Sequence, residues 1–583
     1  MKNEIINRIY ELAGDFTSQA EAELRGHLES GSIGLAQLNP NAGDIEYNAK
    51  KIAKYIKHAQ NIGLELIIFP ESALIGCPIQ DIVKRYPKIA EENFKWLKEI
   101  AKITTNTTAI VGFLEPVKDA NCYYNSIAVL SNGEIKEILQ KNNDNFGLFK
   151  ININSTSYLA GCCAIPALKK EEFSNYAQIA KKYSTPVIIT NQTGVVDNMV
   201  FEGSSVVYDK NGEIFARAKT FEEQLLIVNI KNDLKKIYPK FESMPDLKSF
   251  TLDYEWDLER TYKTIIQGIQ DYFNKNGFER AVLGLSGGLD STVCAVLLAD
   301  ALGAENVLGI SMPSKITSQE SKTDAEQLAH NLGINFKVIP IKEMVDTTSK
   351  NLNGLFKDVE KQWNYRYKQS FTNDNIQART RAVILWGISN EFSKCLPIAT
   401  SDKSEAYMGY ATINGDMSGG FAPIADVTKT KLFALARWMN ENRSVKNVIP
   451  ESIILKKPGA ELAIDPKTGK PLIAEDALMP YEFLDEVIWR IENKNEYYEK
   501  MLESEFLYEK KNKISKEQKI EWLDKFYRRM ATSLYKGSIL PPFVVLDKNS
   551  LNKYSYKQPI TSSRINYKEL NEGSIRGKIQ ENP

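Results

Sequence analysis

A short turn rich in glycine and serine, at residues 286–291, lies between two apolar segments. The segment before it, AVLGL, is short and continuous, which favours a buried strand, and the segment after it, STVCAVLLADAL, favours a buried helix. Two later segments, NVLGISMP and NFKVIPI, repeat the strand pattern after helical stretches. Strands that alternate with helices form a parallel sheet, so the turn is predicted at the carboxyl edge of that sheet, where ligands bind.

The residue types in this turn suit a phosphate group. Glycine lets the backbone approach an anion closely, and the following helix offers N–H groups and the positive end of its dipole. Asp290 would repel a phosphate directly, so we interpret it as a ligand of Mg²⁺. The turn does not match the Walker pattern GxxxxGK[ST]. Its predicted ATP-binding residues are Ser286, Gly287, Gly288, Leu289, Asp290 and Ser291.

The SGGLDS pattern resembles the pyrophosphate loop of enzymes that cleave ATP between its α and β phosphates. Such enzymes activate a carboxylate or carbonyl as an adenylate, which a nitrogen nucleophile then attacks. The loop alone leaves several families open, including GMP, asparagine and argininosuccinate synthetases and tRNA-modifying enzymes. Another ligase of this loop class is therefore an alternative at this point.

Further blocks resemble the synthetase domain of the glutamine-dependent NAD⁺ synthetase family. They are NIQARTR at 375–381, TSDKSE at 400–405, the long block at 415–438, and PGAEL to YEFLD within 458–485. The resemblance keeps the family order through most of residues 254–560. It implies a ligase that amidates deamido-NAD to NAD⁺ through an acyl-adenylate, with ATP as co-substrate and AMP and pyrophosphate as products.

The resemblance also implies residue roles. Thr400 and Lys429 would contact ATP, and Asp290 and Glu405 would bind Mg²⁺. The residues implied for deamido-NAD are Asn375, Arg379, Glu405, Asp416 and Lys536. The chain departs from the family at four positions: Ser401 and Asp402 replace a usual Gly-Asn, Gly459 replaces a hydroxyl residue, and Ala425 replaces a usual lysine. These departures predict weaker nucleotide affinity, and Gly459 and Ala425 leave a non-catalytic paralogue as an alternative.

Residues 33–230 resemble the nitrilase-type glutaminase domain that many bacteria fuse to the synthetase. LAQLNPNAGDIEYNAKKI, IIFPESALIGCP and PVIITNQTGVVDNMVFEGSSVVYDKNGEI carry this match. The family uses a Glu–Lys–Cys triad, in which glutamate takes the thiol proton, cysteine attacks glutamine and lysine stabilises the oxyanion. Glu71 and Lys141 match the glutamate and the lysine, as catalytic residues.

The cysteine block of that triad appears deleted. ININSTSYLAG follows Lys141 closely and resembles a later family strand, and its distance to the NQTG block, 191 − 152 = 39 positions, fits the family spacing. Cys162 and Cys163 are displaced candidates for the nucleophile, and Phe146 stands where the family uses tyrosine. We therefore predict free ammonia as the nitrogen donor, with glutamine hydrolysis by a displaced cysteine as the alternative.

Composition limits the remaining possibilities. A chain of 583 residues needs more than one core. Lys plus Arg and Asp plus Glu both number 74, which gives no electrostatic case for a nucleic acid or a membrane as partner. Six cysteines, with no CxxC pair, indicate a reducing cytoplasm. By resemblance we also expect a homo-oligomer.

The predicted fold class is α/β. It combines a nitrilase-like α-β-β-α sandwich with a Rossmann-like pyrophosphate-loop domain of the adenine nucleotide alpha hydrolase type. The predicted domain map is a helical extension at 1–32, the nitrilase-like domain at 33–230, a linker at 231–253, and the synthetase domain with a basic tail at 254–583.

Overall fold

The computed structural model divides the chain into two compact units, residues 1–254 and 255–583, which are described separately. The structure describes residues 28, 31–79, 82, 86, 88–117, 123–140, 147–153, 156–167, 171–229, 235–236, 257–363, 372–459, 473–546 and 550. Most of the predicted extension at 1–32 and the whole predicted linker, apart from two residues, lie outside these ranges, as do Lys141 and Phe146. No helix in the described part of the chain is long and apolar enough to cross a membrane.

Two β-sheets packed face to face form the centre of the first unit. The larger sheet has the order β14-β13-β1-β2-β3-β4-β5, the smaller has the order β12-β11-β8-β7-β6, and β10 pairs with β9 alone. The strands are β1 (Ser32–Gln37), β2 (Leu66–Ile68), β3 (Thr108–Pro116), β4 (Tyr123–Ser131), β5 (Glu134–Gln140), β6 (Leu148–Ile153), β7 (Thr156–Cys163), β8 (Val187–Asn191), β9 (Thr193–Val196), β10 (Met199–Glu202), β11 (Val206–Tyr208), β12 (Ile214–Arg217), β13 (Gln224–Asn229) and β14 (Lys235–Lys236).

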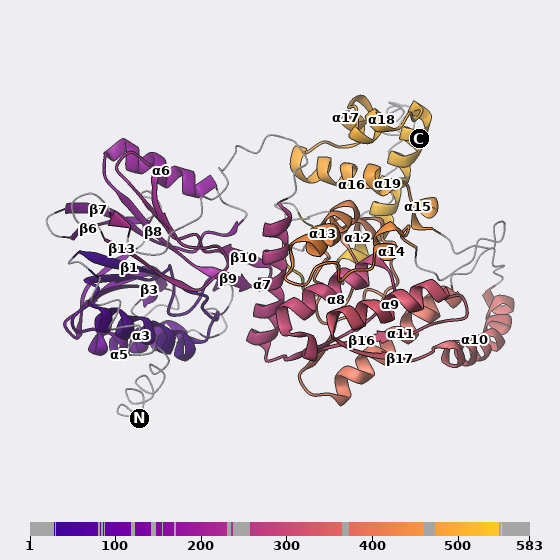
Figure 1. Ribbon diagram of the computed structural model, residues 1–583, viewed down its shortest axis with the longest axis horizontal. Coiled ribbons are helices and arrows are strands. Elements are labelled where there is room, and N and C mark those ends of the chain that lie inside the picture. The colour runs from indigo at the N-terminus through magenta and orange to yellow at the C-terminus, as the bar shows by residue number, and fades with distance from the viewer. Residues whose placement is uncertain are drawn as a thin grey trace, which may run out of the picture. The chain divides into compact units, whose positions relative to one another are not determined.

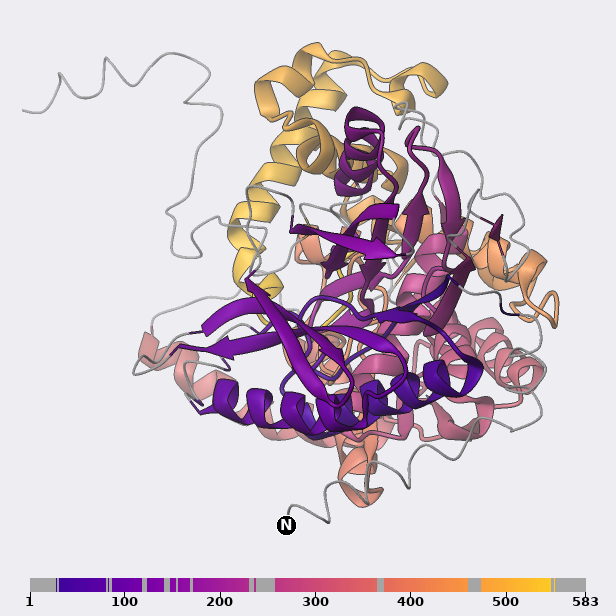
Figure 2. The same ribbon diagram turned by 90° about the vertical axis from the view of Figure 1, so that its left-hand side faces the viewer.

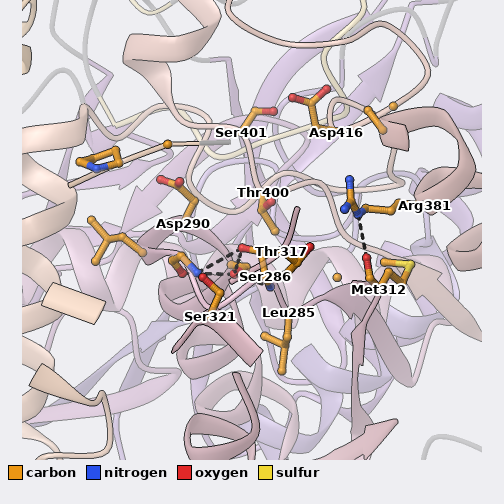
Figure 3. A pocket seen from close by; sticks show the side chains of 18 of the residues that line it. Leu285, Ser286, Asp290, Met312, Thr317, Ser321, Arg381, Thr400, Ser401 and Asp416 are labelled. Carbon is orange, nitrogen blue, oxygen red and sulfur yellow. Dashed lines mark hydrogen bonds between the residues drawn. The ribbon is translucent and has the colours of Figure 1, made fainter. Parts of the chain in front are cut away.

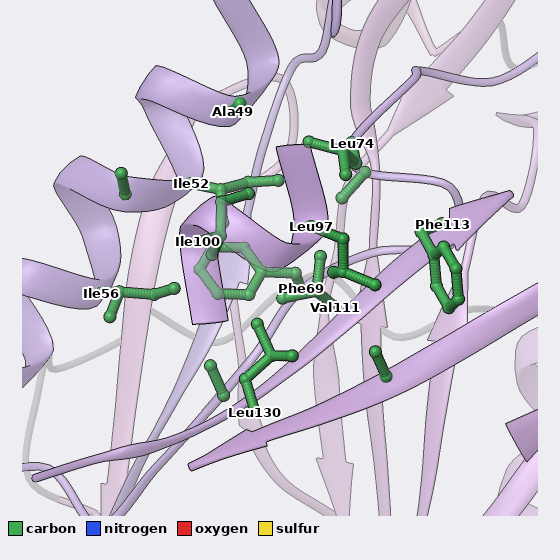
Figure 4. Packing of buried hydrophobic residues seen from close by; sticks show 14 of the residues in the cluster. Ala49, Ile52, Ile56, Phe69, Leu74, Leu97, Ile100, Val111, Phe113 and Leu130 are labelled. Carbon is green, nitrogen blue, oxygen red and sulfur yellow. The ribbon is translucent and has the colours of Figure 1, made fainter. Parts of the chain in front are cut away.

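Helices cover the outer faces of both sheets. Apolar side chains of α3 (Ile45–Ile62) and α5 (Ile89–Ile103) pack on the larger sheet, and α6 (Glu171–Tyr183) packs on the smaller one. Figure 1 shows these helices on opposite sides of the two sheets, and Figure 2 shows the indigo helices lying along the strands. Figure 4 shows the core between the larger sheet and its two helices, in which Ile52 and Ile100 from the helices contact Phe69 from the chain after β2. The predicted α-β-β-α sandwich is confirmed.

Turn residues shape two hairpins in this unit. Asn132 and Gly133 both have positive φ, 52° and 79°, and connect β4 to β5 as the Asn-Gly hairpin pattern requires. The prediction of a single strand for ININSTSYLAG was wrong, because the structure divides it between the antiparallel strands β6 and β7. The polar Asn-Ser-Thr stretch in its middle is a turn signal.

A four-stranded parallel sheet organises the second unit, in the order β17-β16-β15-β18. Its strands are β15 (Arg280–Gly284), β16 (Val307–Ser311), β17 (Asn335–Val338) and β18 (Cys395–Pro397). Its helices are α7 (Leu258–Asn276), α8 (Leu289–Leu302), α9 (Gln319–Leu332), α10 (Lys342–Trp363), α11 (Thr372–Glu391), α12 (Lys403–Met408), α13 (Lys429–Asn442), α14 (Glu451–Leu455), α15 (Ala474–Ala477), α16 (Tyr481–Trp489), α17 (Tyr498–Glu503), α18 (Leu507–Lys511) and α19 (Lys516–Gly537), with a short 3₁₀ helix at Ala304–Asn306 and a π-helix, η4, at Arg490–Lys494. The predicted Rossmann-like sheet is confirmed.

A helical layer follows the sheet in the chain. Helices α16 to α19 share an apolar core with α12, built around Phe483, Phe506 and Phe526. These helices form the orange and yellow end of the ribbon in Figure 1. Because α12 follows β18 directly, this core connects the carboxyl edge of the sheet to the last described helices.

Candidate active site

The chain order of the parallel sheet creates a crevice at its carboxyl edge. From β15 the chain proceeds to β16, which pairs with one edge of β15, whereas β18 pairs with the other edge. The strand order therefore reverses between β15 and β18, and the segments that follow these two strands diverge. Parallel sheets bind ligands at such switch points. A cavity of about 260 Å³ lies here. Its walls come from the turn after β15, the ends of β16 and β18, helix α11 and the 456–459 segment.

Most of the predicted ATP-binding residues line this cavity. Those on its wall are Ser286, Gly288, Leu289, Asp290, Ser291 and Thr400. Figure 3 shows Ser286, Asp290 and Thr400 around one space, with Asp416 on another side of it. The six-residue loop that we predicted is shorter in the structure, because α8 begins at Leu289 and includes Asp290 and Ser291 in its first turn.

The geometry of the turn suits a bound anion. Gly287 has φ +74°, and a Cβ there would lie 2.2 Å from the carbonyl oxygen of Ser321. The Ser286 hydroxyl accepts a hydrogen bond from the Gly288 N–H at 3.2 Å and lies 3.1 Å from the Ser291 hydroxyl. Within the described chain, no side chain caps the N-terminus of α8. Its first N–H groups are thus available to a phosphate.

Three carboxylates surround one buried ammonium beside this turn. Nζ of Lys429 lies 2.6 Å from Asp290 Oδ1, 2.8 Å from Asp402 Oδ2 and 3.0 Å from Glu405 Oε1. The lysine and Asp402 side chains are fully buried, whereas those of Asp290 and Glu405 are partly exposed, at 25% and 18%. Asp290 and Glu405, whose side chains are partly exposed, are also the two carboxylate residues on the cavity wall.

Burial and charge together set the protonation of this cluster. Burial raises the pKa of Asp402 to about 7, against the lowering effect of Lys429. Burial also raises the pKa of Glu405, and the two neighbouring carboxylates raise it further. Burial alone would lower the pKa of Lys429, but the three carboxylates raise it above its ordinary value, so this lysine stays protonated.

Helix α12 holds two of these carboxylates in place. Asp402 is its N-cap and accepts a hydrogen bond from the Glu405 N–H at 2.8 Å. The Ser404 hydroxyl donates to Asp485 at 2.5 Å and accepts from the Lys429 N–H at 2.9 Å. This short helix is therefore fixed by polar contacts at consecutive positions.

A second buried lysine anchors the opposite side of α12. Lys403 pairs with Glu492 in the π-helix at 2.6 Å and with Asp426 at 3.0 Å, and all three side chains are almost fully buried. The Tyr407 hydroxyl donates to Glu492 at 2.7 Å. Asp426 in turn accepts the Leu546 N–H at 2.6 Å.

The residues predicted for deamido-NAD gather around the 409–416 segment. Asp416 lies on the cavity wall and accepts the Thr412 N–H at 2.6 Å, and burial raises its pKa. Asn375, Arg379 and Lys536 contact the same segment but are not on the cavity wall. Lys536, for example, donates to the carbonyl oxygens of Gly409 and Ala411, at 2.9 and 2.7 Å.

In the first unit, the carboxylate of Glu71 lies at the end of β7. It accepts hydrogen bonds from the Asn125 amide at 2.5 Å and from the Ala164 N–H at 3.2 Å. Cys162 belongs to the core between the two sheets, and Cys163 belongs to the core beneath α6, where its sulfur lies 3.5 Å from the Tyr176 hydroxyl. Both thiols are 2% exposed.

Comparisons with known proteins agree with this two-part architecture. Residues 261–528 match the NAD synthase family, and residues 32–149 match the carbon-nitrogen hydrolase family. A glutamine-dependent NAD(+) synthetase of Thermotoga maritima is 34% identical over 530 residues, which cover 78% of this chain and 88% of that relative. The chain belongs to the glutamine-dependent NAD(+) synthetase family. Its relative of the same name in Aquifex aeolicus is 35% identical over 521 residues, again 78% and 88% of the two chains.

Solved structures of this family share the fold. A crystal structure of a glutamine-dependent NAD(+) synthetase from Cytophaga hutchinsonii aligns with a TM-score of 0.73 and 20% identity, over 93% of this chain and all of that one. As a member of the family, the chain is a ligase that forms a carbon–nitrogen bond, and the family uses ATP as co-substrate.

The sequence analysis missed one residue of the cavity wall and one of the carboxylate cluster. Arg381 lies on the cavity wall, and its Nε donates to the Met312 carbonyl at 3.2 Å. Ala378 and Leu385 line the same cavity, so a helical spacing of three and four residues could have identified Arg381. Asp402 was noted only as a departure from the family pattern, and no local signal placed it beside Lys429.

Proposed function

We propose that this NAD⁺ synthetase amidates deamido-NAD in its second unit and takes its nitrogen from free ammonia. The nicotinate carboxylate attacks the α-phosphorus of ATP, and pyrophosphate leaves. Ammonia then attacks the carbonyl carbon of the acyl-adenylate, AMP leaves with the bonding electron pair, and the amide nitrogen loses a proton. Ser286, the Gly288 N–H and the α8 N-terminus are in place to bind the departing pyrophosphate.

The carboxylate cluster suits a divalent cation. One oxygen from each of Asp290, Asp402 and Glu405 lies within 4.8 Å of the others, and oxygen ligands are those that Mg²⁺ prefers. Mg²⁺ bound there would neutralise charge on the triphosphate. Lys429, whose ammonium lies against the same carboxylates, would add a positive charge beside the triphosphate.

The position of the thiols supports ammonia as the nitrogen donor. A nucleophilic cysteine must be ionised and within reach of its substrate. Cys162 and Cys163 are both buried in apolar cores, on opposite faces of β7, while Glu71 receives hydrogen bonds from Asn125 and Ala164. The matched carbon-nitrogen hydrolase segment, residues 32–149, ends before these cysteines.

The relatives' printed names favour the alternative, in which glutamine is hydrolysed by a displaced cysteine. The decisive experiment supplies the purified full-length chain with ATP, Mg²⁺ and deamido-NAD, and either ammonium chloride or glutamine as nitrogen source. NAD⁺ and AMP are quantified by chromatography. We expect rapid turnover with ammonium and little with glutamine.

Cysteine variants identify the nucleophile if glutamine is used. We expect C162S and C163S to keep the full ammonium-dependent rate. Cys77, which is partly exposed and follows Glu71 by six positions, provides the matched control C77S. Efficient glutamine use by the wild type that C162S or C163S abolishes, and C77S does not, would refute ammonia as the preferred donor. No NAD⁺ from either nitrogen source would refute the synthase assignment and favour a non-catalytic paralogue.

Two further properties stay predictions. The family resemblance predicts a homo-oligomer, which analytical ultracentrifugation of the full-length chain checks directly. A cytoplasmic location is checked by fractionating cells that express the protein.

A further inference from the structure

The three carboxylates that could hold a divalent cation surround a lysine ammonium. Nζ of Lys429 lies within 3.0 Å of one oxygen from each of Asp290, Asp402 and Glu405. The carboxylate oxygens that could bind a metal lie within 4.8 Å of one another. A divalent cation among them would therefore compete with the ammonium for the same three partners.

Asp402 gives this cluster a charge that its structural role does not need. One of its oxygens caps α12 by accepting the Glu405 N–H at 2.8 Å. An asparagine at this position could accept that hydrogen bond with its amide oxygen, so the cap does not require a charge. The second oxygen of Asp402 instead faces Lys429 Nζ at 2.8 Å.

The charge of Asp402 bears on how the cluster balances a divalent cation. When a bound cation keeps all four groups ionised, three carboxylates and one ammonium give −3 + 1 = −2, which one divalent cation neutralises. With an asparagine at position 402 the sum is −2 + 1 = −1, and the same cation leaves an excess positive charge. The ionised cluster thus matches a divalent cation and Lys429 together.

We propose that Asp402 is a third carboxylate ligand of the divalent cation, and that Lys429 occupies the cation position until ATP arrives. The triphosphate then receives the ammonium, and the cation enters with the nucleotide. Cation and nucleotide consequently bind together, and the cation alone binds weakly. This inference rests on the proposed function in one respect, since it takes the cation to be the one that supports adenylation.

The first test measures Mn²⁺ binding to the full-length chain without nucleotide, by electron paramagnetic resonance. We expect weak binding to the wild type and binding at least about ten-fold tighter to Lys429→Met, which removes the competing ammonium. Adding Asp402→Asn to that variant should abolish the gain. Lys519→Met is the matched control, because Lys519 is a buried, ion-paired lysine outside the cluster, and it should bind Mn²⁺ as the wild type does.

The second test does not need the Lys429 variant to fold. Asp402→Asn keeps an oxygen for the α12 cap and removes only the charge. With a non-cleavable ATP analogue, its Mn²⁺ affinity should fall at least about ten-fold below that of the wild type. Tight Mn²⁺ binding to wild type without nucleotide, or unchanged affinity in Asp402→Asn, would overturn the proposal. Neither measurement requires turnover, so a failure here is distinguishable from a failure of the synthase assignment.

Discussion

Replacement of the buried Lys403 by methionine should strongly destabilise the second unit. Methionine fills a similar volume but leaves Glu492 and Asp426 without the ammonium that lies 2.6 and 3.0 Å from them. Their side chains are 3% and 1% exposed, so water cannot take its place. Removing one member of a buried ion pair costs about 3–5 kcal/mol, and we expect the loss in this range because both carboxylates are affected.

Equilibrium unfolding in urea, followed by tryptophan fluorescence, measures this loss of unfolding free energy from the transition of the second unit. The matched variant is the triple substitution K403M/E492Q/D426N, in which no buried charge remains unpaired. We expect it to recover at least about half of the lost free energy, since the remaining hydrogen bonds from Tyr407 and Leu546 still have oxygen acceptors. A loss below about 1 kcal/mol in K403M, the size of an exposed ion pair, would refute the reasoning. So would a triple variant no more stable than the single one.

Two further results are expected. Gly287→Ala forces a Cβ to within 2.2 Å of the Ser321 carbonyl and should weaken ATP binding at least about ten-fold in calorimetry, whereas Gly277→Ala, at the same φ of +74° with open space around it, should leave ATP binding unchanged. Burial raises the pKa of Asp485, so the folded protein keeps its proton over a pH range above about 4 in which the unfolded chain has lost it. The unfolding free energy of the wild type should therefore fall, relative to D485N, as the pH rises through that range; parallel urea midpoints from pH 4 to 7 would contradict this.

The glycine-rich turn between β15 and α8 was predictable because its signals are local. AVLGL, the two glycines and the apolar helix lie within one short stretch, and each constrains the backbone of its neighbours. The exact start of α8 was missed, since Leu289 and Asp290 fit either a loop or a first helical turn.

The carboxylate cluster shows where sequence reasoning stops. Asp290 and Lys429 are 139 positions apart, and only the sheet order brings them to 2.6 Å. The family resemblance implied that Asp290 and Glu405 share one Mg²⁺ ion and that Lys429 contacts ATP, but it did not predict the ion pairs of Lys429 with both carboxylates. Only the fold shows that Asp402 lies beside Lys429, because a carboxylate at a helix N-cap is common and does not by itself indicate such a contact.

The contacts of the 540–546 segment have a consequence for synthesis on the ribosome. Pro542 accepts a hydrogen bond from Ala422, Val544 packs against Gly268 of α7, and the Leu546 N–H binds Asp426, the partner of Lys403. The strands and turn of the second unit are translated well before this segment. A nascent chain that ends before residue 542 thus lacks the Leu546–Asp426 contact that supports Lys403 of α12, so nucleotide-binding competence should emerge only after residue 546 has been translated.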